Sequence, residues 1–147
     1  YLTASDIDPV SIDVTADNAI VNDVPCGVAQ GQLALCVAAG TAHDLITTRA
    51  PYDLVIANIL AGPLIELAPS LADITREGGS LILAGLLNTQ ADAVTRAYRQ
   101  HGFRLRQRND MGDWPSLWLV KRRTYGWKRP LRASGRTSQP PGDFGTW

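Results

Sequence analysis

The sequence predicts an α/β fold in which a mostly parallel sheet is followed by an antiparallel hairpin. Short apolar runs of strand length alternate with segments of helical spacing, as in parallel strands joined by helices. The central run, Tyr52–Ala57, is typical of a strand buried on both faces of such a sheet. The last two strand-like segments are joined by a short link, which indicates an antiparallel pair.

Length and composition are those of one globular domain. The chain has 147 residues, of which 45% are hydrophobic and 19% charged. No stretch approaches the roughly 18 apolar residues needed to cross a bilayer, and no signal peptide opens the chain, so we expect a cytoplasmic protein without membrane contact. Cys26 and Cys36 form no CxxC motif, and idle thiols in a reducing cytosol are favoured over a disulfide.

The first strand, Leu2–Ser5, is predicted to end at Asp6 and to lead directly into a helix. Asp8 is placed to cap that helix, Pro9 suits its first turn, and the helix should run to about Asn22. Asp6 stands where the strand ends. A carboxylate there can accept hydrogen bonds from both ribose hydroxyls of an adenosine-type cofactor. A plain capping role for either aspartate is the alternative.

A second strand is predicted within residues 32–39, and a loop containing His43 follows it. His43 has no partner in the sequence, so a loop role is favoured over a ligand contact. The central strand is expected to stop at Asn58, before a turn begun by Gly62-Pro63. Ligands of open α/β sheets bind at the carboxyl ends of the strands, so Asn58 would face that crevice. An Asn that only caps a turn is the equally weighted alternative.

The next helix is expected over residues 64–74, and Pro69 should kink or interrupt it. Glu77–Gly79 reads as a tight turn, and residues 80–86 as another buried strand. Asn88 is predicted to cap the following helix, and Gly102 to stop it.

Two final strands are expected over residues 103–108 and 115–122. The first of them alternates apolar with basic residues. That alternation would place three basic side chains on one solvent-exposed strand face: Arg104, Arg106 and Arg108. A sheet that closes with such a hairpin is typical of methyltransferases rather than of nicotinamide-binding domains.

The net charge of zero hides an uneven distribution. Residues 1–120 hold seven Arg and no Lys against thirteen acids, whereas residues 121–147 hold seven Lys plus Arg and one acid. Residues 124–147 are basic and rich in Pro, Gly and Ser without any period, which predicts a disordered tail. RNA contact by this tail is the minor alternative.

Four motifs together resemble the PrmA family of S-adenosylmethionine-dependent methyltransferases, and the resemblance covers roughly residues 1–123. The stretch beginning at Asn58 is fairly specific, because related glutamine-directed and nucleic-acid-directed enzymes commonly carry Asn-Pro-Pro-Tyr at that place. The motifs are Asp6-Ile7-Asp8-Pro9, Asn58-Ile59-Leu60-Ala61-Gly62-Pro63-Leu64, Glu66-Leu67-Ala68-Pro69 and Gly112-Asp113-Trp114.

The resemblance implies a Rossmann-like class I methyltransferase sheet that methylates lysine or α-amino groups of the large-subunit ribosomal protein L11. It assigns Asp6 to the cofactor ribose and Asn58 to the methyl-transfer centre, in contact with both cofactor and acceptor amine. Such enzymes need no metal, and the sequence shows no ligand cluster for one. Ile59 and Leu60 are expected to line the pocket, although core packing explains them equally well.

The resemblance also implies that N-terminal parts of the family's structure are missing from this sequence. The family has a central strand, a glycine-rich loop and a substrate-recognition domain before the position of Asp6. We therefore expect residues 1–123 to be a partial, N-terminally truncated methyltransferase domain with unpaired strand edges. The alternatives are a methyltransferase for a small molecule or RNA, or an inactive fragment that serves as a nucleotide-binding or interaction module.

Overall fold

The computed structural model describes residues 1–123, and the predicted tail therefore lies outside the described residues. Two parallel strands, β1 (Leu2–Asp6) and β2 (Leu33–Val37), form one small sheet. A second sheet has the order β3-β4-β6-β5, with β3 parallel to β4 and the later pairs antiparallel. Its strands are β3 (Tyr52–Asn58), β4 (Thr75–Ala84), β5 (Phe103–Met111) and β6 (Trp114–Lys121). The predicted α/β class and closing hairpin are confirmed.

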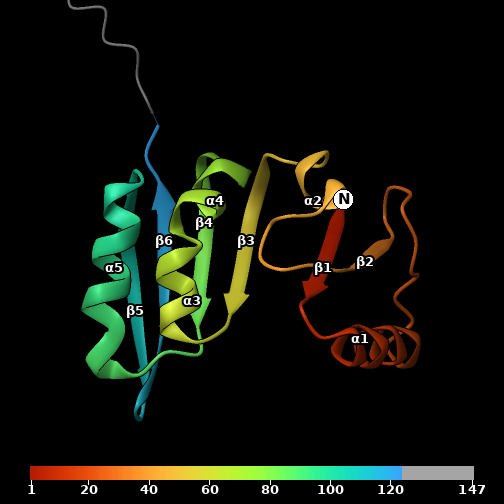
Figure 1. The fold of residues 1–147 in the computed structure, drawn as a ribbon, viewed down its shortest axis with the longest axis horizontal. Coiled ribbons are helices and arrows are strands. Elements are labelled where there is room, and N and C mark those ends of the chain that lie inside the picture. The colour runs from red at the N-terminus through yellow and green to blue at the C-terminus, as the bar shows by residue number, and fades with distance from the viewer. Residues whose placement is uncertain (124–147) are drawn as a thin grey trace, which may run out of the picture.

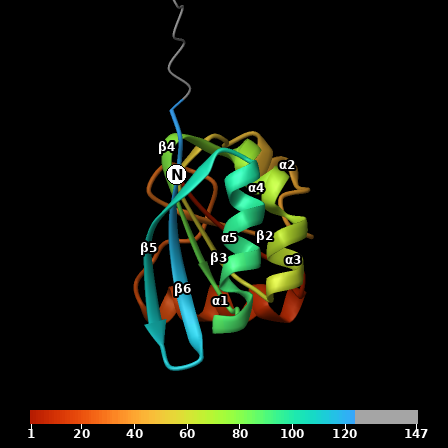
Figure 2. The ribbon, with the colours of Figure 1, turned by 90° about the vertical axis from the view of Figure 1, so that its left-hand side faces the viewer.

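The helices cover only one face of the four-stranded sheet. Figure 2 shows α3, α4 and α5 on one side of β3–β6, and Figure 1 shows α1 beneath β1 and β2. No helix in residues 1–123 is both long and apolar enough to cross a membrane. The helices are α1 (Pro9–Val21), α2 (Asp44–Thr47), α3 (Ala61–Glu66), α4 (Ala68–Ile74) and α5 (Ala91–Gln100), with a short 3-10 turn, η1 (Asn88–Gln90), before α5.

The hydrophobic core lies between this sheet and its three helices. Tyr98 of α5 packs edge-on against Phe103 at the start of β5, with ring centroids 5.8 Å apart. The large apolar or aromatic residues with no exposed surface come from α3, β4, the loop after β4, α5, β5 and β6: Leu64, Leu81, Leu83, Leu86, Val94, Tyr98, Phe103, Leu117 and Leu119.

The prediction that β3 is buried on both faces is wrong. Leu54 and Ile56 are 48% and 65% exposed, whereas Val55 and Ala57 pack against the core from the other face. Within the described residues, no helix covers the face that carries Leu54 and Ile56. Residues opposite one another in the sheet share a face, so the exposed face continues through Ile82 of β4 to Trp118 of β6.

The β1–β2 pair is attached to the rest of the molecule through side chains. Within residues 1–123, neither β1 nor β3 has a strand on its second edge, as the sequence predicted. Arg49 donates hydrogen bonds to the carbonyl oxygens of Leu2 and Val28 at 3.1 and 2.7 Å. Arg49 also donates to the hydroxyl oxygen of Thr3 at 3.1 Å. Polar contacts thus supplement a small core at this junction.

Several predicted helix signals are confirmed. Asp8 is the N-cap of α1, where its Oδ1 accepts the N–H of Val10 at 2.9 Å, and Pro9 is the first helical residue. The helical stretch is interrupted just before Pro69, between α3 and α4. The helix begins earlier than expected, however, so Gly62-Pro63 belongs to the first turn of α3 and not to a preceding turn. Proline is tolerated there because first-turn N–H groups lack helical partners.

Two other predictions are corrected. Glu77–Gly79 is no separate turn but an irregular part of β4, where the register steps from Tyr52 opposite Thr75 to Leu54 opposite Ser80. Asn88 caps no helix. Instead, Gln90 accepts the N–H of Leu87 through its side chain at 2.8 Å, and Asn88 bonds to the β5–β6 hairpin.

The three arginines of β5 do not share one face. A bulge between Leu105 and Gln107 inserts Arg106 as an extra residue. Arg104 therefore lies opposite Val120 and Arg108 opposite Leu117, and these two partners are on different faces of β6. The prediction of solvent exposure holds for all three side chains.

Candidate active site

The carboxyl ends of the parallel strands lie along one edge of the molecule. β1 and β3 both end at the lower edge in Figure 1, and β4 ends beside β3 because the two strands are parallel. Asp6 is the last residue of β1 and Asn58 is the last residue of β3, as the sequence predicted. This edge is where open α/β sheets bind their ligands.

Asp6 presents an exposed carboxylate at the end of β1. Its Oδ1 accepts the N–H of Asp8 at 2.9 Å, which fixes the side chain over the turn into α1. Its carbonyl accepts the N–H of Ala38 at 2.9 Å and continues the pairing beyond β2. A carboxylate has two oxygens with about four acceptor positions. Most of the hydrogen-bond acceptor positions of Asp6 therefore remain available for hydroxyl groups.

Asn58 is held by the neighbouring strand. It lies opposite Ala84, and the next residue, Ile59, donates its N–H to the carbonyl of Ala84 at 3.2 Å. Gly85 then passes directly under Ile59: a Cβ at Gly85 would lie 2.6 Å from the Ile59 carbonyl oxygen, and φ of Gly85 is +83°. Only glycine accommodates both conditions. The sequence reasoning missed this residue, although a glycine just after a buried strand was a visible signal.

The far side of the Asn58–Leu60 segment is fixed by α3. Leu60 is the N-cap residue of this helix, and Leu64, in its second turn, is fully buried. The hydroxyl of Tyr98 donates to the Leu64 carbonyl at 2.8 Å. Burial raises the pKa of Tyr98 far above its ordinary value, so the hydroxyl keeps the proton that it donates. The segment is thus anchored at both ends.

The hairpin turn that resembles the family motif reaches the same edge. The Asn88 side chain donates to the carbonyl of Gly112 at 2.7 Å, and its backbone N–H donates to the carbonyl of Asp113 at 3.0 Å. Arg108 donates to the side-chain oxygen of Asn88 at 2.9 Å. Leu87, Asn88, Thr89 and Asp113 line a hollow of about 200 Å³ there. Sequence reasoning did not foresee this cluster, because its members lie about 20 residues apart.

The structure brings Asp6 and Asn58 to one edge without joining them. Within residues 1–123, no hydrogen bond or ion pair connects the two side chains, and neither residue lines a described hollow. Ile59 and Leu60 are 38% and 69% exposed, so neither is a core residue. No three side chains of metal-binding type cluster within the described part of the chain.

The other residues singled out in the sequence have structural roles. His43 is the N-cap of α2, where its Nδ1 accepts the N–H of Leu45 at 3.1 Å, which agrees with the favoured loop role. Both cysteines are free thiols, as predicted. Cys36 is buried, and this burial raises the pKa of its thiol, with Arg49 opposing the shift.

The sequence matches the family model described as ribosomal protein L11 methyltransferase (PrmA) over residues 1–122. The chain belongs to the PrmA family. A ribosomal protein L11 methyltransferase of Brucella abortus is 41% identical over 119 residues, which cover 81% of this chain and 40% of that protein. A Mesorhizobium japonicum protein of the same name is 45% identical over 101 residues, covering 69% of this chain and 33% of that protein. This PrmA-family chain thus spans well under half the length of these relatives.

Solved structures agree with this PrmA assignment at the level of the fold. A ribosomal protein L11 methylase from Lactobacillus delbrueckii superposes with a TM-score of 0.66 at 24% identity, covering 82% of this chain and 57% of that one. A methyltransferase from Pyrococcus furiosus gives a TM-score of 0.64 at 16% identity, covering 82% and 62%. The Rossmann-like methyltransferase fold predicted from the sequence is therefore shown.

Proposed function

We propose that residues 1–123 are part of an S-adenosylmethionine-dependent protein N-methyltransferase that acts on lysine or α-amino groups of ribosomal protein L11. The supporting observation is that a PrmA-family chain carries an exposed carboxylate, Asp6, and an anchored amide, Asn58, at the carboxyl ends of two parallel strands. We place this activity in the cytoplasm, with ribosomal protein L11 as the partner.

Asp6 is the candidate contact for the cofactor ribose. Its exposed carboxylate is oriented by the Asp8 N–H and retains acceptor capacity for two vicinal hydroxyls, so the donor set fits an adenosine-type ligand. S-adenosylmethionine, when bound, supplies an electrophilic methyl group on a sulfonium. In this proposal the glycine-rich loop that the family carries ahead of Asp6 completes the binding of the cofactor.

Asn58 is the candidate residue for aligning the acceptor amine. An amine nucleophile must be neutral and must aim its lone pair at the methyl group, while a lysine amine in water has a pKa of about 10.4. Desolvation favours the neutral amine. The Asn58 side-chain oxygen and a nearby backbone carbonyl can accept the amine N–H bonds, which orients the remaining lone pair. Alignment of reacting groups is the main contribution that an in-line transfer requires.

The fixed backbone around Asn58 supports its proposed role in aligning the acceptor amine. Gly85 against the Ile59 backbone, and Tyr98 bonded to Leu64, fix the segment on both sides of Leu60. A residue on a rigid support holds an acceptor more accurately than one on a free loop.

The cofactor proposal is tested by calorimetric titration of the 147-residue chain with S-adenosylhomocysteine. We expect binding by the wild type and a loss of at least about tenfold in affinity for Asp6→Asn, since a neutral amide accepts hydroxyl bonds more weakly. Asp13→Asn, an exposed change on α1, should leave affinity unchanged. Equal affinities for all three proteins would contradict the role of Asp6, and a folded chain that does not bind would favour the alternative of an inactive fragment.

The transfer proposal is tested with labelled S-adenosylmethionine and purified ribosomal protein L11. Asn58→Ala should slow methyl transfer by about 100-fold through lost alignment while binding of S-adenosylhomocysteine is retained. Asn18→Ala on the exposed side of α1 is the matched control. Transfer to RNA or to small amines instead of L11 would favour the alternative substrate classes, and binding without any transfer would favour a nucleotide-binding module.

A further inference from the structure

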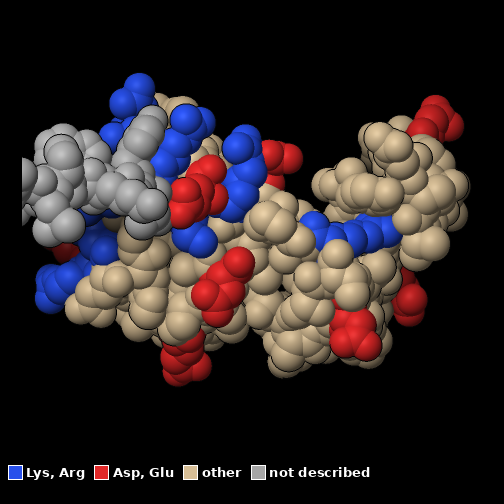
Figure 3. Space-filling model, turned by 90° about the horizontal axis from the view of Figure 1, so that it is seen from above, with Lys and Arg blue, Asp and Glu red and all other residues tan. Residues whose placement is uncertain are grey.

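A second hollow lies at the opposite edge of the sheet from Asp6 and Asn58. It has a volume of about 690 Å³ and is formed where β4 and β5 begin and β6 ends. Its lining contains four basic residues and no acid: Gly78, Arg104, Val120, Lys121, Arg122 and Arg123. Figure 3 shows Lys and Arg gathered at this end of the molecule, viewed from above the sheet. The proposed methyl transfer uses none of these residues.

Three of the four cations have no acidic partner among residues 1–123. The described ion pairs involve Arg76 with Asp53 and Arg108 with Asp110. Arg104, Arg122 and Arg123 are all exposed and take part in neither pair. Lys121 differs, because its Nζ already donates to the carbonyls of Ala72 and Thr75 at 2.6 and 2.8 Å. The hollow therefore offers three guanidinium groups to an anionic ligand.

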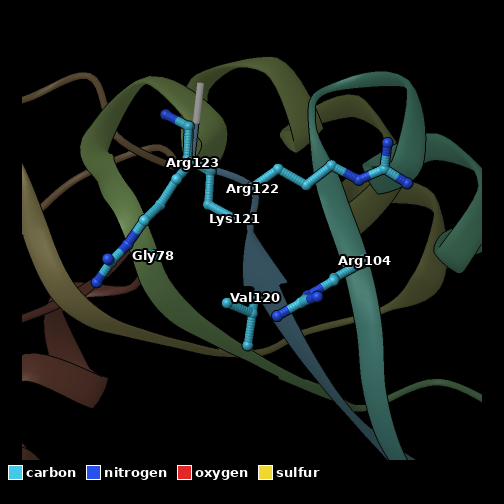
Figure 4. Close-up of a pocket in the computed structure, with 6 residues that line it drawn as sticks. All are labelled: Gly78, Arg104, Val120, Lys121, Arg122 and Arg123. Carbon is cyan, nitrogen blue, oxygen red and sulfur yellow. The ribbon is translucent and has the colours of Figure 1, made fainter. Parts of the chain in front are cut away.

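The directions of these side chains favour a ligand with several anionic groups. Figure 4 shows Arg104 reaching from β5 toward Val120, Arg123 running along Gly78, and Arg122 extending away from Arg123. The contact with Gly78 is close, since a Cβ there would lie 2.9 Å from the Arg123 Nε. One phosphate ion cannot meet guanidinium groups that diverge in this way. A polymer with phosphates at regular intervals can meet them in succession, and planar guanidinium groups match phosphate oxygens well.

An exposed tryptophan beside the hollow favours a nucleic acid over an acidic peptide. Trp118 precedes Val120 by two residues on β6, so the two side chains share a sheet face with Arg104. The indole is 37% exposed and its Nε1 donates to Ser80 Oγ at 3.0 Å, which fixes the ring. Aromatic side chains next to a basic groove bind single strands by base stacking. An acidic peptide offers no bases to stack.

We propose that this hollow binds the phosphate backbone of single-stranded RNA, with a base stacked on Trp118. The site is independent of the proposed methyl transfer, because it lies at the other edge of the sheet. It also differs from the RNA contact considered for residues 124–147, since every residue named here precedes that segment.

The test is fluorescence anisotropy with a labelled 12-nucleotide oligouridine at several salt concentrations, using the full 147-residue chain. The pocket variant is Arg104→Gln/Arg122→Gln/Arg123→Gln. Its charge-matched control is Arg96→Gln/Arg99→Gln/Arg106→Gln, which changes three exposed arginines that do not line the hollow. Both proteins keep residues 124–147, so any difference between them reports on the hollow. Thermal melts by circular dichroism establish that each variant folds.

We expect the pocket variant to bind the RNA at least about tenfold more weakly, and its salt slope to fall by about 2 for three lost phosphate contacts. The control should keep most of its affinity. Trp118→Leu should weaken binding by about tenfold, whereas Trp114→Leu, at the far end of β6, should not. Equal effects of the two arginine variants would overturn the site. Equal affinity for a polyglutamate peptide, or no effect of Trp118→Leu, would overturn the assignment to RNA.

Discussion

The four-stranded sheet and the β1–β2 pair differ sharply in how much they bury. The sheet, its helices and the loop after β4 contain all nine of the large apolar or aromatic side chains with no exposed surface named above. In the β1–β2 pair, β1 contains no buried residue, and the buried residues of β2, which are Leu33, Ala34 and Cys36, each keep some exposed surface; the adjoining α1 contains one buried residue, Ala19. One half of the candidate site, Asn58, stands on the well-packed layer. The other half, Asp6, stands on the pair that side-chain contacts help to hold.

This difference indicates that Asn58 and Asp6 are held in position by different kinds of contact. The position of Asn58 follows from packing, through Gly85 and Tyr98. Polar contacts of Arg49 with Leu2 and Val28 help to position the strand pair that carries Asp6. Regions with few buried contacts open locally at low free energy, so β1 should be the more mobile support.

The largest loss of stability is expected for a substitution in the packed layer of the four-stranded sheet and its helices. Leu117→Ala removes a fully buried side chain of β6 and should lower the free energy of unfolding by about 2–5 kcal/mol. Ile20→Ala on α1, where the side chain is 71% exposed, should change it by less than about 0.5 kcal/mol. Urea denaturation followed by circular dichroism measures both. Comparable losses would show that the two regions are equally packed.

Gly85→Ala should cause the second-largest loss of stability. The added methyl group would meet the Ile59 backbone, and φ of +83° is unfavourable for alanine, so we expect a loss of about 2–4 kcal/mol. Gly112→Ala is the control, because its φ is +57° but nothing lies within 4 Å of the added Cβ; it should cost about 1 kcal/mol. Denaturation midpoints compare the two variants, and similar values would refute the contact with Ile59.

Tyr98→Phe should lower the free energy of unfolding by about 1–3 kcal/mol at neutral pH, because the buried Leu64 carbonyl loses its donor. The pKa of Tyr98 is raised in the folded chain, so its stabilising effect is complete below the unfolded value near 10 and declines as pH rises above that value. The stability difference between wild type and Tyr98→Phe should therefore shrink above pH 10. A difference that is constant from pH 7 to 11 would contradict this account.

The smallest expected effect concerns Arg49. Arg49→Gln removes hydrogen bonds to Leu2 and Val28 and should cost about 1 kcal/mol. Hydrogen exchange of the β1 and β2 amides should accelerate about fivefold or more, while β4 and β6 amides remain protected. Arg96→Gln on α5 serves as the control. Uniform acceleration across both sheets would mean that the two regions open together.

The sequence by itself determined the features that depend on neighbouring residues. Asp8 and Pro9 begin α1 because a short acceptor side chain and a fixed φ suit a helix start. Pro69 separates α3 from α4 because it lacks an N–H. Asp6 and Asn58 are recognisable as polar residues at the ends of apolar runs. The order of strands and helices follows from the same local patterns.

Only the tertiary structure decided the features that depend on residues far apart in the chain. The exposure of Leu54 and Ile56 depends on which elements cover β3, which no local pattern records. The bulge at Arg106 reverses the face of Arg108, because one extra residue changes every later position in a strand. The basic hollow joins Gly78 to Arg104 and Arg123. Pairing of distant strands fixes these contacts, so they could not be predicted from sequence spacing.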